Sequence, residues 1–158
     1  MNMLQKLNRS EQITGAAGIL LLIGVIAFPW YHVGFSGITV GGQTIGGASY
    51  NGSALQGPGA FAGVLALILV IALLGELGIS RFAAAPLPQL PITWRAAELY
   101  SSIAVLALLL IKFLCHIGNF GWGFYADLVL AIALAYGATG MYRSRAAEPV
   151  RSVAQHGA

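Results

Sequence analysis

The stretch IKFLCHIGNFGWGFYADLV, residues 111–129, decides the fold class of this chain. It contains the end of one apolar segment, a short loop of glycine and aromatic residues, and the start of a second apolar segment. Lys112 lies about one helical turn before the loop, and Asp127 lies about one turn after it. Because consecutive helices joined by a short loop run antiparallel, we expect the two charged residues at similar depth in a helix pair.

The composition of the whole chain indicates an integral membrane protein. Of its 158 residues, 58% are hydrophobic and only 8% are charged, whereas soluble domains carry roughly 25% charged residues. The apolar residues form runs long enough to cross a bilayer. The net charge is +3, but the basic residues lie at the ends of these runs, as membrane topology requires. We therefore expect the lipid bilayer as a partner, and no nucleic acid.

The apolar runs predict an all-α membrane protein, a bundle of four transmembrane helices. The transmembrane domain covers residues 12–142, between a cytoplasmic lead at 1–11 and a cytoplasmic, disordered tail at 143–158. Its spans are predicted at about 13–31, 59–79, 94–115 and 124–142. Ser10 or Thr14 is predicted to cap the first helix and Thr93 the third. Trp30 and Tyr31 are predicted to lie at the membrane interface.

The segment between the first two spans, residues 33–58, is rich in glycine and carries no formal charge. Residues 38–40 (ITV) and 43–45 (QTI) flank Gly41 and Gly42, which is the pattern of a short β-hairpin with a two-residue turn. The alternative is a flexible loop. A two-stranded ribbon is marginally stable in water, so we expect the hairpin to lie on the helix ends or on a partner.

The basic residues predict the orientation. Only Lys112 falls toward one side of a four-span arrangement. On the other side lie Lys6, Arg9, Arg81, Arg95, Arg143, Arg145 and Arg151. By the positive-inside rule, we expect a multi-pass protein of the cell membrane (inner or plasma) with both termini in the cytoplasm.

The candidate polar site at the outer side is the pair Lys112 and Asp127. One interpretation is a structural ion pair between the last two helices, which lowers the cost of placing the charges in a membrane. The other is a functional site that also recruits His32 and His116 to relay protons, hold a metal or bind an anionic headgroup. No spacing forces the two histidines together, so we assign no metal and no cofactor.

At the inner side, Glu76 is expected to form an interfacial salt bridge within a cluster of Glu76, Arg81, Arg95 and Glu98. The alternative for Glu76 is a proton carrier within the membrane. Small residues predict close helix packing; they are Gly59, Gly63, Ala133 and Gly137. The single cysteine, Cys115, excludes an internal disulfide and is predicted to be a small buried hydrophobe.

The chain offers no pairing of nucleophile and base and no phosphate-binding glycine loop, so we expect no enzyme. The leading interpretation is a non-enzymatic accessory or scaffolding subunit, which packs against itself as a homo-oligomer or against a larger membrane complex. The alternative is a small oligomeric transporter or channel that uses Lys112, Asp127 and Glu76. A third interpretation is contact with a lipid or quinone through Lys112, His116 and Trp122.

The first span ends in FPWYHV at residues 28–33, and a glycine-rich loop, three further spans and an arginine-containing tail follow. This layout resembles that of small four-span membrane proteins of high-GC Gram-positive bacteria. The resemblance implies the fold and the membrane location but supplies no activity and no catalytic residues. The long first loop is also similar to that of claudin-like four-span proteins, although this chain lacks their tryptophan and cysteine-pair pattern.

Overall fold

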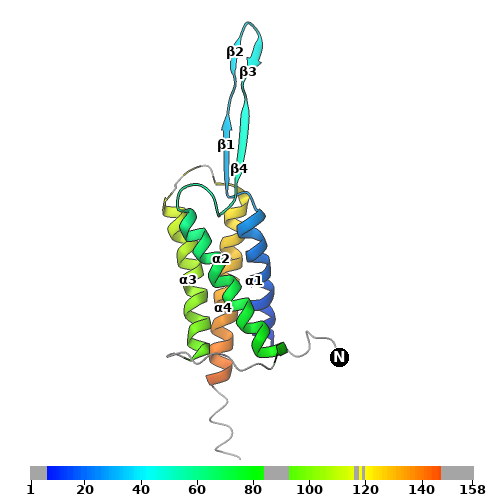
Figure 1. The fold of residues 1–158 in the computed structure, drawn as a ribbon, viewed down its shortest axis with the longest axis vertical. Helices are drawn as coiled ribbons and strands as arrows, with labels where there is room; N and C mark the ends of the chain where they lie inside the picture. The colour runs from blue at the N-terminus through cyan, green and yellow to red at the C-terminus, as the bar shows by residue number, and fades with distance from the viewer. Residues whose placement is uncertain (1–6, 84–92, 116–117, 119, 147–158) are drawn as a thin grey trace, which may run out of the picture.

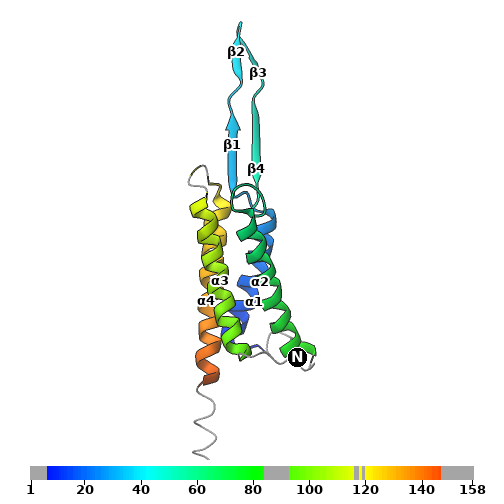
Figure 2. The same ribbon diagram turned by 60° about the vertical axis from the view of Figure 1, so that its left-hand side comes forward.

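The computed structural model of this chain is an antiparallel four-helix bundle with a β-ribbon that projects from one end (Figure 1). The structure describes residues 7–83, 93–115, 118 and 120–146. The helices are α1 (Arg9–Ala27), α2 (Ala60–Gly78), α3 (Trp94–Cys115) and α4 (Trp122–Ala146). Each helix packs against the next, and α4 also packs against α1. We name the two ends of the bundle the ribbon end and the terminal end, because α1 begins and α4 finishes opposite the ribbon (Figure 2).

In the part of the chain that the structure describes, four helices are long and apolar enough to cross a membrane, as the sequence predicts. The bounds of α3 are those predicted, whereas α1 begins and ends four residues earlier than expected. Helix α2 continues into a π-helical turn, η2 (Ile79–Ala83). Helix α4 extends to Ala146, so residues 143–146 of the predicted tail are helical. Residues 147–158 lie outside the described part of the chain.

The start of α1 is fixed by Asn8, and not by Ser10 or Thr14 as predicted. Asn8 forms a capping box with Glu11: its side chain caps the first turn, and its backbone N–H donates to Glu11 Oε2 at 2.9 Å. This reciprocal arrangement satisfies two backbone donors that a helix start otherwise leaves open. Thr93 precedes α3 as predicted and accepts hydrogen bonds from Ala96 through its backbone and its hydroxyl.

The end of α1 follows from Pro29, because the residue before a proline avoids the helical region. Phe28 is accordingly extended, with φ −77° and ψ 142°. Trp30 then turns back into the bundle and is fully buried, so its side chain contacts the protein interior at the end of the helices. Tyr31 is also buried and begins the first strand.

The ribbon consists of two antiparallel strand pairs. β2 (Ile38–Val40) pairs with β3 (Gln43–Ile45), and this confirms the predicted hairpin. Gly41 and Gly42 both adopt positive φ values, 61° and 79°, which a turn of this type requires. Beyond the prediction, β1 (Tyr31–Phe35) pairs with β4 (Ala48–Gly52) and lengthens the ribbon to the bundle. The ribbon projects away from the helix ends (Figures 1 and 2), so the expectation that it lies on them is wrong.

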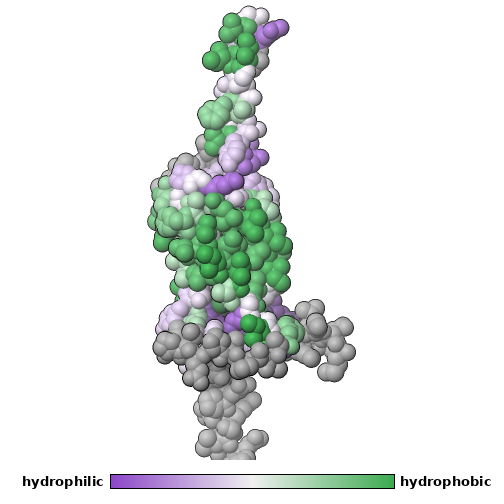
Figure 3. All heavy atoms as spheres, viewed as in Figure 1, coloured by the Kyte–Doolittle hydropathy of each residue, from purple (hydrophilic) through white to green (hydrophobic). Residues whose placement is uncertain are grey.

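Apolar side chains fill the interior of the bundle and also cover its outward faces. The core contains Leu21, Val25, Val70, Leu109 and Leu134, each at most 1% exposed. On the visible face of the bundle, a hydrophobic band covers the middle of the helices, and more polar residues lie above and below it (Figure 3). Large aliphatic side chains are exposed on all four helices, among them Ile23, Ile68, Ile103, Val129 and Ile132. A soluble monomer rarely exposes so continuous an apolar surface.

The four predicted packing residues have different neighbours. Gly137 lies against the backbone of Thr14 in α1, where a side chain would collide. Gly59 lies 3.4 Å from the Cα of Lys112 in α3, measured from an ideal Cβ position. Gly63 lies against the backbone of Ala54 in the preceding loop and not against a helix, so its predicted role in helix packing is wrong. Ala133 is partly buried against the core.

Candidate functional site

Three polar side chains are completely buried at the ribbon end of the bundle: Trp30, Lys112 and Asp127 are each 0% exposed. They come from three different parts of the chain, namely the junction of α1 with the ribbon, the last turn of α3 and the second turn of α4. We call these three residues the junction cluster. Buried polar groups must find partners within the protein, so their contacts define what the cluster does.

The ammonium group of Lys112 is held by the loop that precedes α2. Its Nζ donates to the backbone oxygen of Gln56 at 3.0 Å and to that of Pro58 at 3.2 Å. The same nitrogen lies 5.2 Å from the ring centre of Tyr31 and 5.8 Å from that of Trp30. These are distances at which a cation is attracted to an aromatic face. Lys112 therefore fastens the loop and the ribbon base to α3.

Asp127 is held by Trp30. The indole Nε1 donates to Asp127 Oδ2 at 2.6 Å, which joins two residues 97 positions apart. Asp127 Oδ1 has no hydrogen-bond partner among the residues that the structure describes. Gly24 of α1 backs onto this oxygen, and an ideal Cβ at Gly24 would overlap it. Helix α1 can pass this close to the carboxylate only because residue 24 has no side chain.

The backbone around Trp30 is anchored as firmly as its side chain. Trp30 N donates to Gly52 O at 2.8 Å, and Gly121 N donates to Trp30 O at 2.7 Å. Gly121 and Gly123 both lie against the backbone of Pro29, at positions where a Cβ would collide. The indole packs edge to face on Phe124, with 5.4 Å between ring centres. The strand pair β1–β4 and the start of α4 thus meet at one residue.

The predicted ion pair between Lys112 and Asp127 does not form. The two residues reach the same end of the bundle, as predicted, but Lys112 binds loop carbonyls and Asp127 binds the indole N–H. Trp30 stands between them, with its ring facing the ammonium and its N–H directed at the carboxylate. The cluster is therefore a three-residue clamp that joins the ribbon base, the loop and the last two helices.

Two residues beside the clamp differ in their environments. Burial raises the pKa of the Tyr31 hydroxyl above its ordinary value of 10.0, and the neighbouring Cys115 adds to this rise. Tyr31 also packs on Phe120, with 6.0 Å between ring centres. Cys115 itself is exposed, so the prediction of a small buried hydrophobe is wrong.

The two histidines predicted near this end cannot be compared as a pair. His32 lies on β1, is exposed, and has its Nδ1 2.8 Å from Asn51 Oδ1 across the ribbon. His116 lies outside the described residues. Within the described ranges, no three His, Cys, Asp or Glu side chains gather closely enough to hold a metal ion.

At the terminal end, the structure divides the predicted cluster. Glu76 and Glu98 are both buried and line a cavity of about 60 Å³ between α2 and α3. Arg81 forms a salt bridge with Glu11 of α1, a residue outside the predicted cluster. The side chain of Arg95 lies outside the described part of the structure.

Sequence reasoning missed the partners of these charges. Glu11 is not among the predicted cluster residues, yet it is buried and pairs with Arg81, a residue 70 positions away. Two tryptophans, Trp30 and Trp122, follow or adjoin turning segments near this end, and the sequence does not tell which of them donates to Asp127. Gly24 carried no signal, because glycine is common throughout the first apolar run.

Comparison of the chain with protein-family models, with curated proteins and with solved structures finds no match.

Proposed function

We propose that this protein is a multi-pass membrane protein without enzymatic activity that acts as an accessory or scaffolding subunit, and that the β-ribbon is its docking element. The four apolar helices support insertion in the membrane. The basic residues support an orientation with both termini in the cytoplasm and the ribbon outside. This is the layout that the resemblance to small bacterial four-span proteins also implies.

The observation that carries the proposal is the apolar tip of the ribbon. Ile38, Val40 and Ile45 are 74%, 62% and 65% exposed. Because side chains alternate along a strand and Ile38 pairs with Ile45, these three side chains share one face. A ribbon that projects into water gains nothing from three exposed aliphatic side chains unless another surface covers them. The tip therefore has the character of an unoccupied contact surface.

The strand edges of the ribbon support the same function. Residues 33–57 contain no charged residue and no proline, although these are the features that proteins use to prevent strand addition at exposed edges. An edge of this kind can accept a strand from a partner through backbone hydrogen bonds. A second copy of this chain is as well suited to such pairing as a different subunit, since an uncharged ribbon does not repel itself.

The clamp supports a structural task for the buried charges in preference to transport. Lys112 is fixed by two carbonyl oxygens and two aromatic rings, and Asp127 is fixed by Trp30. A conducting or carrying group must exchange partners during its cycle. We therefore do not favour the small transporter or channel, although its residues are buried as that function requires.

The test is site-directed crosslinking of the tip in native membranes. Cys115 is replaced by serine, and a single cysteine is placed at Ile38 or, as a matched control, at Thr39 on the opposite face. We expect Ile38→Cys to give a discrete crosslinked species with a copy of the chain or with a partner subunit, and Thr39→Cys to give far less. Ile38→Asp should release the protein from this complex on native gels. A protein that stays monomeric in mild detergent, with equal crosslinking at both positions, contradicts the proposal.

A further inference from the structure

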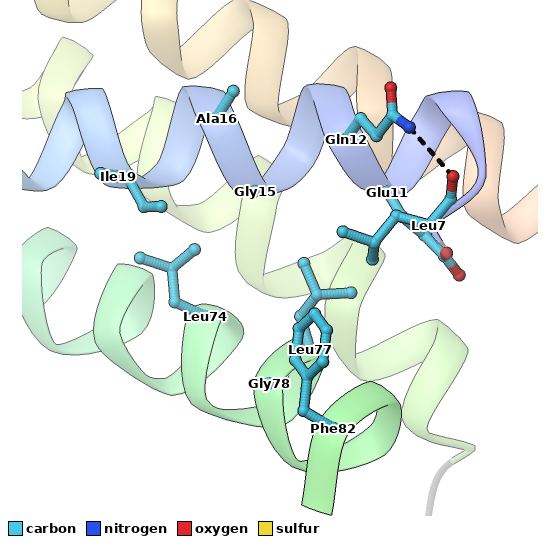
Figure 4. Close-up of a pocket in the computed structure, with 10 residues that line it drawn as sticks. All are labelled: Leu7, Glu11, Gln12, Gly15, Ala16, Ile19, Leu74, Leu77, Gly78 and Phe82. Carbon is cyan, nitrogen blue, oxygen red and sulfur yellow. Dashed lines mark hydrogen bonds between the residues drawn. The ribbon is translucent and has the colours of Figure 1, made fainter. Parts of the chain in front are cut away.

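A cavity of about 370 Å³ lies between α1 and α2 at the terminal end of the bundle. In Figure 4, Ile19 of α1 and Leu74, Leu77 and Phe82 of the facing segment point into the space between the helices. Its walls are almost entirely apolar, and its polar members, Glu11 and Gln12, lie toward the start of α1. We call it the α1–α2 cavity.

Small residues on α1 create this space. Gly15 and Ala16 line the cavity, and neither side chain reaches across to α2. An ideal Cβ at Gly15 would lie 3.6 Å from Leu77, whereas one at Gly18 would lie 2.9 Å from Leu74. The two helices therefore come closer at Gly18 than at Gly15, and the hollow lies beside Gly15. Ala16 is exposed, so the hollow opens on the outward face of the bundle.

The polar end of the cavity is lined by Glu11 and Gln12, and two arginines lie beside these residues. Glu11, which is buried, forms a salt bridge with Arg81, whose side chain remains 34% exposed. Arg9 is also exposed and lies three residues before Gln12, so it lies on the same stripe of α1. Two guanidinium groups and one carboxylate leave an excess of one positive charge at this end. Arginine binds phosphate through paired hydrogen bonds, and Arg81 retains an accessible side for them.

We infer that the α1–α2 cavity holds one acyl chain of an anionic phospholipid, with the lipid phosphate at Arg81 and Arg9. The inference rests on the proposed function, because it requires the helices to lie in a membrane. The volume suits an acyl chain. A cavity of about 370 Å³ has room for about 12 groups of roughly 30 Å³ each, which is the volume of a water molecule and close to that of one methylene group. The length agrees, since Glu11 and Ile19 lie about 12 Å apart along a helix that rises 1.5 Å per residue.

The arginines at the rim and the short length of the cavity favour a lipid over a helix of a partner protein. An apolar helix of a partner needs a groove several turns long, whereas this cavity covers about two turns of α1. A lipid combines one narrow apolar chain with a phosphate at a fixed end. The terminal end is the cytoplasmic end in the proposed orientation, and the cytoplasmic leaflet is the one that carries anionic lipid.

The experiment is native mass spectrometry of the full chain in detergent with equal amounts of phosphatidylglycerol and phosphatidylcholine of identical acyl chains. We expect the protein to retain one phosphatidylglycerol molecule. Arg81→Gln should lower the retained ratio of phosphatidylglycerol to phosphatidylcholine about fivefold, and Glu11→Gln should raise it, because it removes the competing carboxylate. Ile19→Trp should fill the cavity, because Ile19 points into it, and should abolish retention of both lipids.

Val64→Trp is the matched control, because Val64 is exposed on α2 outside the cavity; it should retain lipid as the parent does. Retention that is unchanged in Ile19→Trp, or a lipid ratio that is unchanged in both Arg81→Gln and Glu11→Gln, overturns the inference. Extraction of the parent protein from membranes by alkaline carbonate contradicts the proposed function itself. A protein that resists extraction but retains no lipid contradicts only the inference about the cavity.

Discussion

Replacing Trp30 by phenylalanine tests whether the junction cluster acts as a clamp. The substitution keeps an aromatic ring against Phe124 but removes the N–H that donates to Asp127 Oδ2 at 2.6 Å. Asp127 is then left without a hydrogen-bond partner for either oxygen among the described residues. A hydrogen bond to a charged group contributes about 1.5–3 kcal/mol in proteins, and cycles within membranes reach about 1.7 kcal/mol. Because both groups are fully buried, we expect a coupling free energy of about 1.5 kcal/mol.

The measurement is a double-mutant cycle on the free energy of unfolding in mixed micelles, with SDS as denaturant. The four proteins are the parent, Trp30→Phe, Asp127→Ala and the double variant. Each single variant should be destabilised by about 2–3 kcal/mol, through the lost bond and the smaller side chain. The double variant should be more stable than the sum of the two predicts, because no buried group is left alone.

The matched control is Trp122→Phe, since Trp122 is 60% exposed and packs on Phe28 without entering the cluster. It should change the free energy of unfolding by less than about 1 kcal/mol. Effects of Trp30→Phe and Asp127→Ala that add to within about 0.5 kcal/mol would refute the reasoning, because additivity is the behaviour of independent sites.

Three further changes probe the same end of the bundle. Gly24→Ala should destabilise the fold by about 2–3 kcal/mol, since the new Cβ overlaps Asp127 Oδ1. The control Gly75→Ala, whose Cβ meets no atom within 4 Å, should stabilise the fold by up to about 1 kcal/mol. Equal effects of the two variants in unfolding titrations would contradict the structure. Lys112→Met should speed hydrogen exchange of the amides at 53–59, because two loop carbonyls lose their donor; unchanged exchange by mass spectrometry argues against the anchor. Burial raises the pKa of Tyr31 above 10.0, so its contribution to stability is complete below that pH and is lost as the pH rises through the folded-state pKa. Tyr31→Phe should therefore flatten the dependence of the free energy of unfolding on pH between about pH 9 and pH 12. Parallel pH profiles of the parent and the variant would contradict this.

The sequence predicts the helices well because each depends on residues close together in the chain. An apolar run of span length and the cap at Thr93 are local features, and the bounds of α3 agree with the prediction. The hairpin at 38–45 was predicted for the same reason, since two glycines form its turn. The pair β1–β4 escaped prediction because Gly34, Ser49 and Asn51 have little strand propensity. That pair forms because the inner hairpin sets its register.

Of the candidate site, the sequence predicts only the level along the helices at which the two charged residues lie. Counting residues from the loop at 118–123 places Lys112 and Asp127 at the same level, as the structure confirms. It does not say which way each side chain points around its helix. The partner of Asp127 is 97 residues away, and its approach depends on Gly24 in a third segment. Contacts of this kind depend on how all four helices pack, and the apolar pattern of a single sequence carries no record of that packing.

The anchoring of the ribbon at Trp30 has a mechanical consequence. From Trp30 to Val40 the chain rises about 3.3 Å per residue, or roughly 33 Å in total. A tilt of about 10° at the base therefore displaces the far end by about 6 Å. The pivot of this lever is bonded to the carboxylate of α4 and to the backbone on both sides. A load on the tip is thus transmitted to the last helix, and a shift of that helix is magnified at the tip.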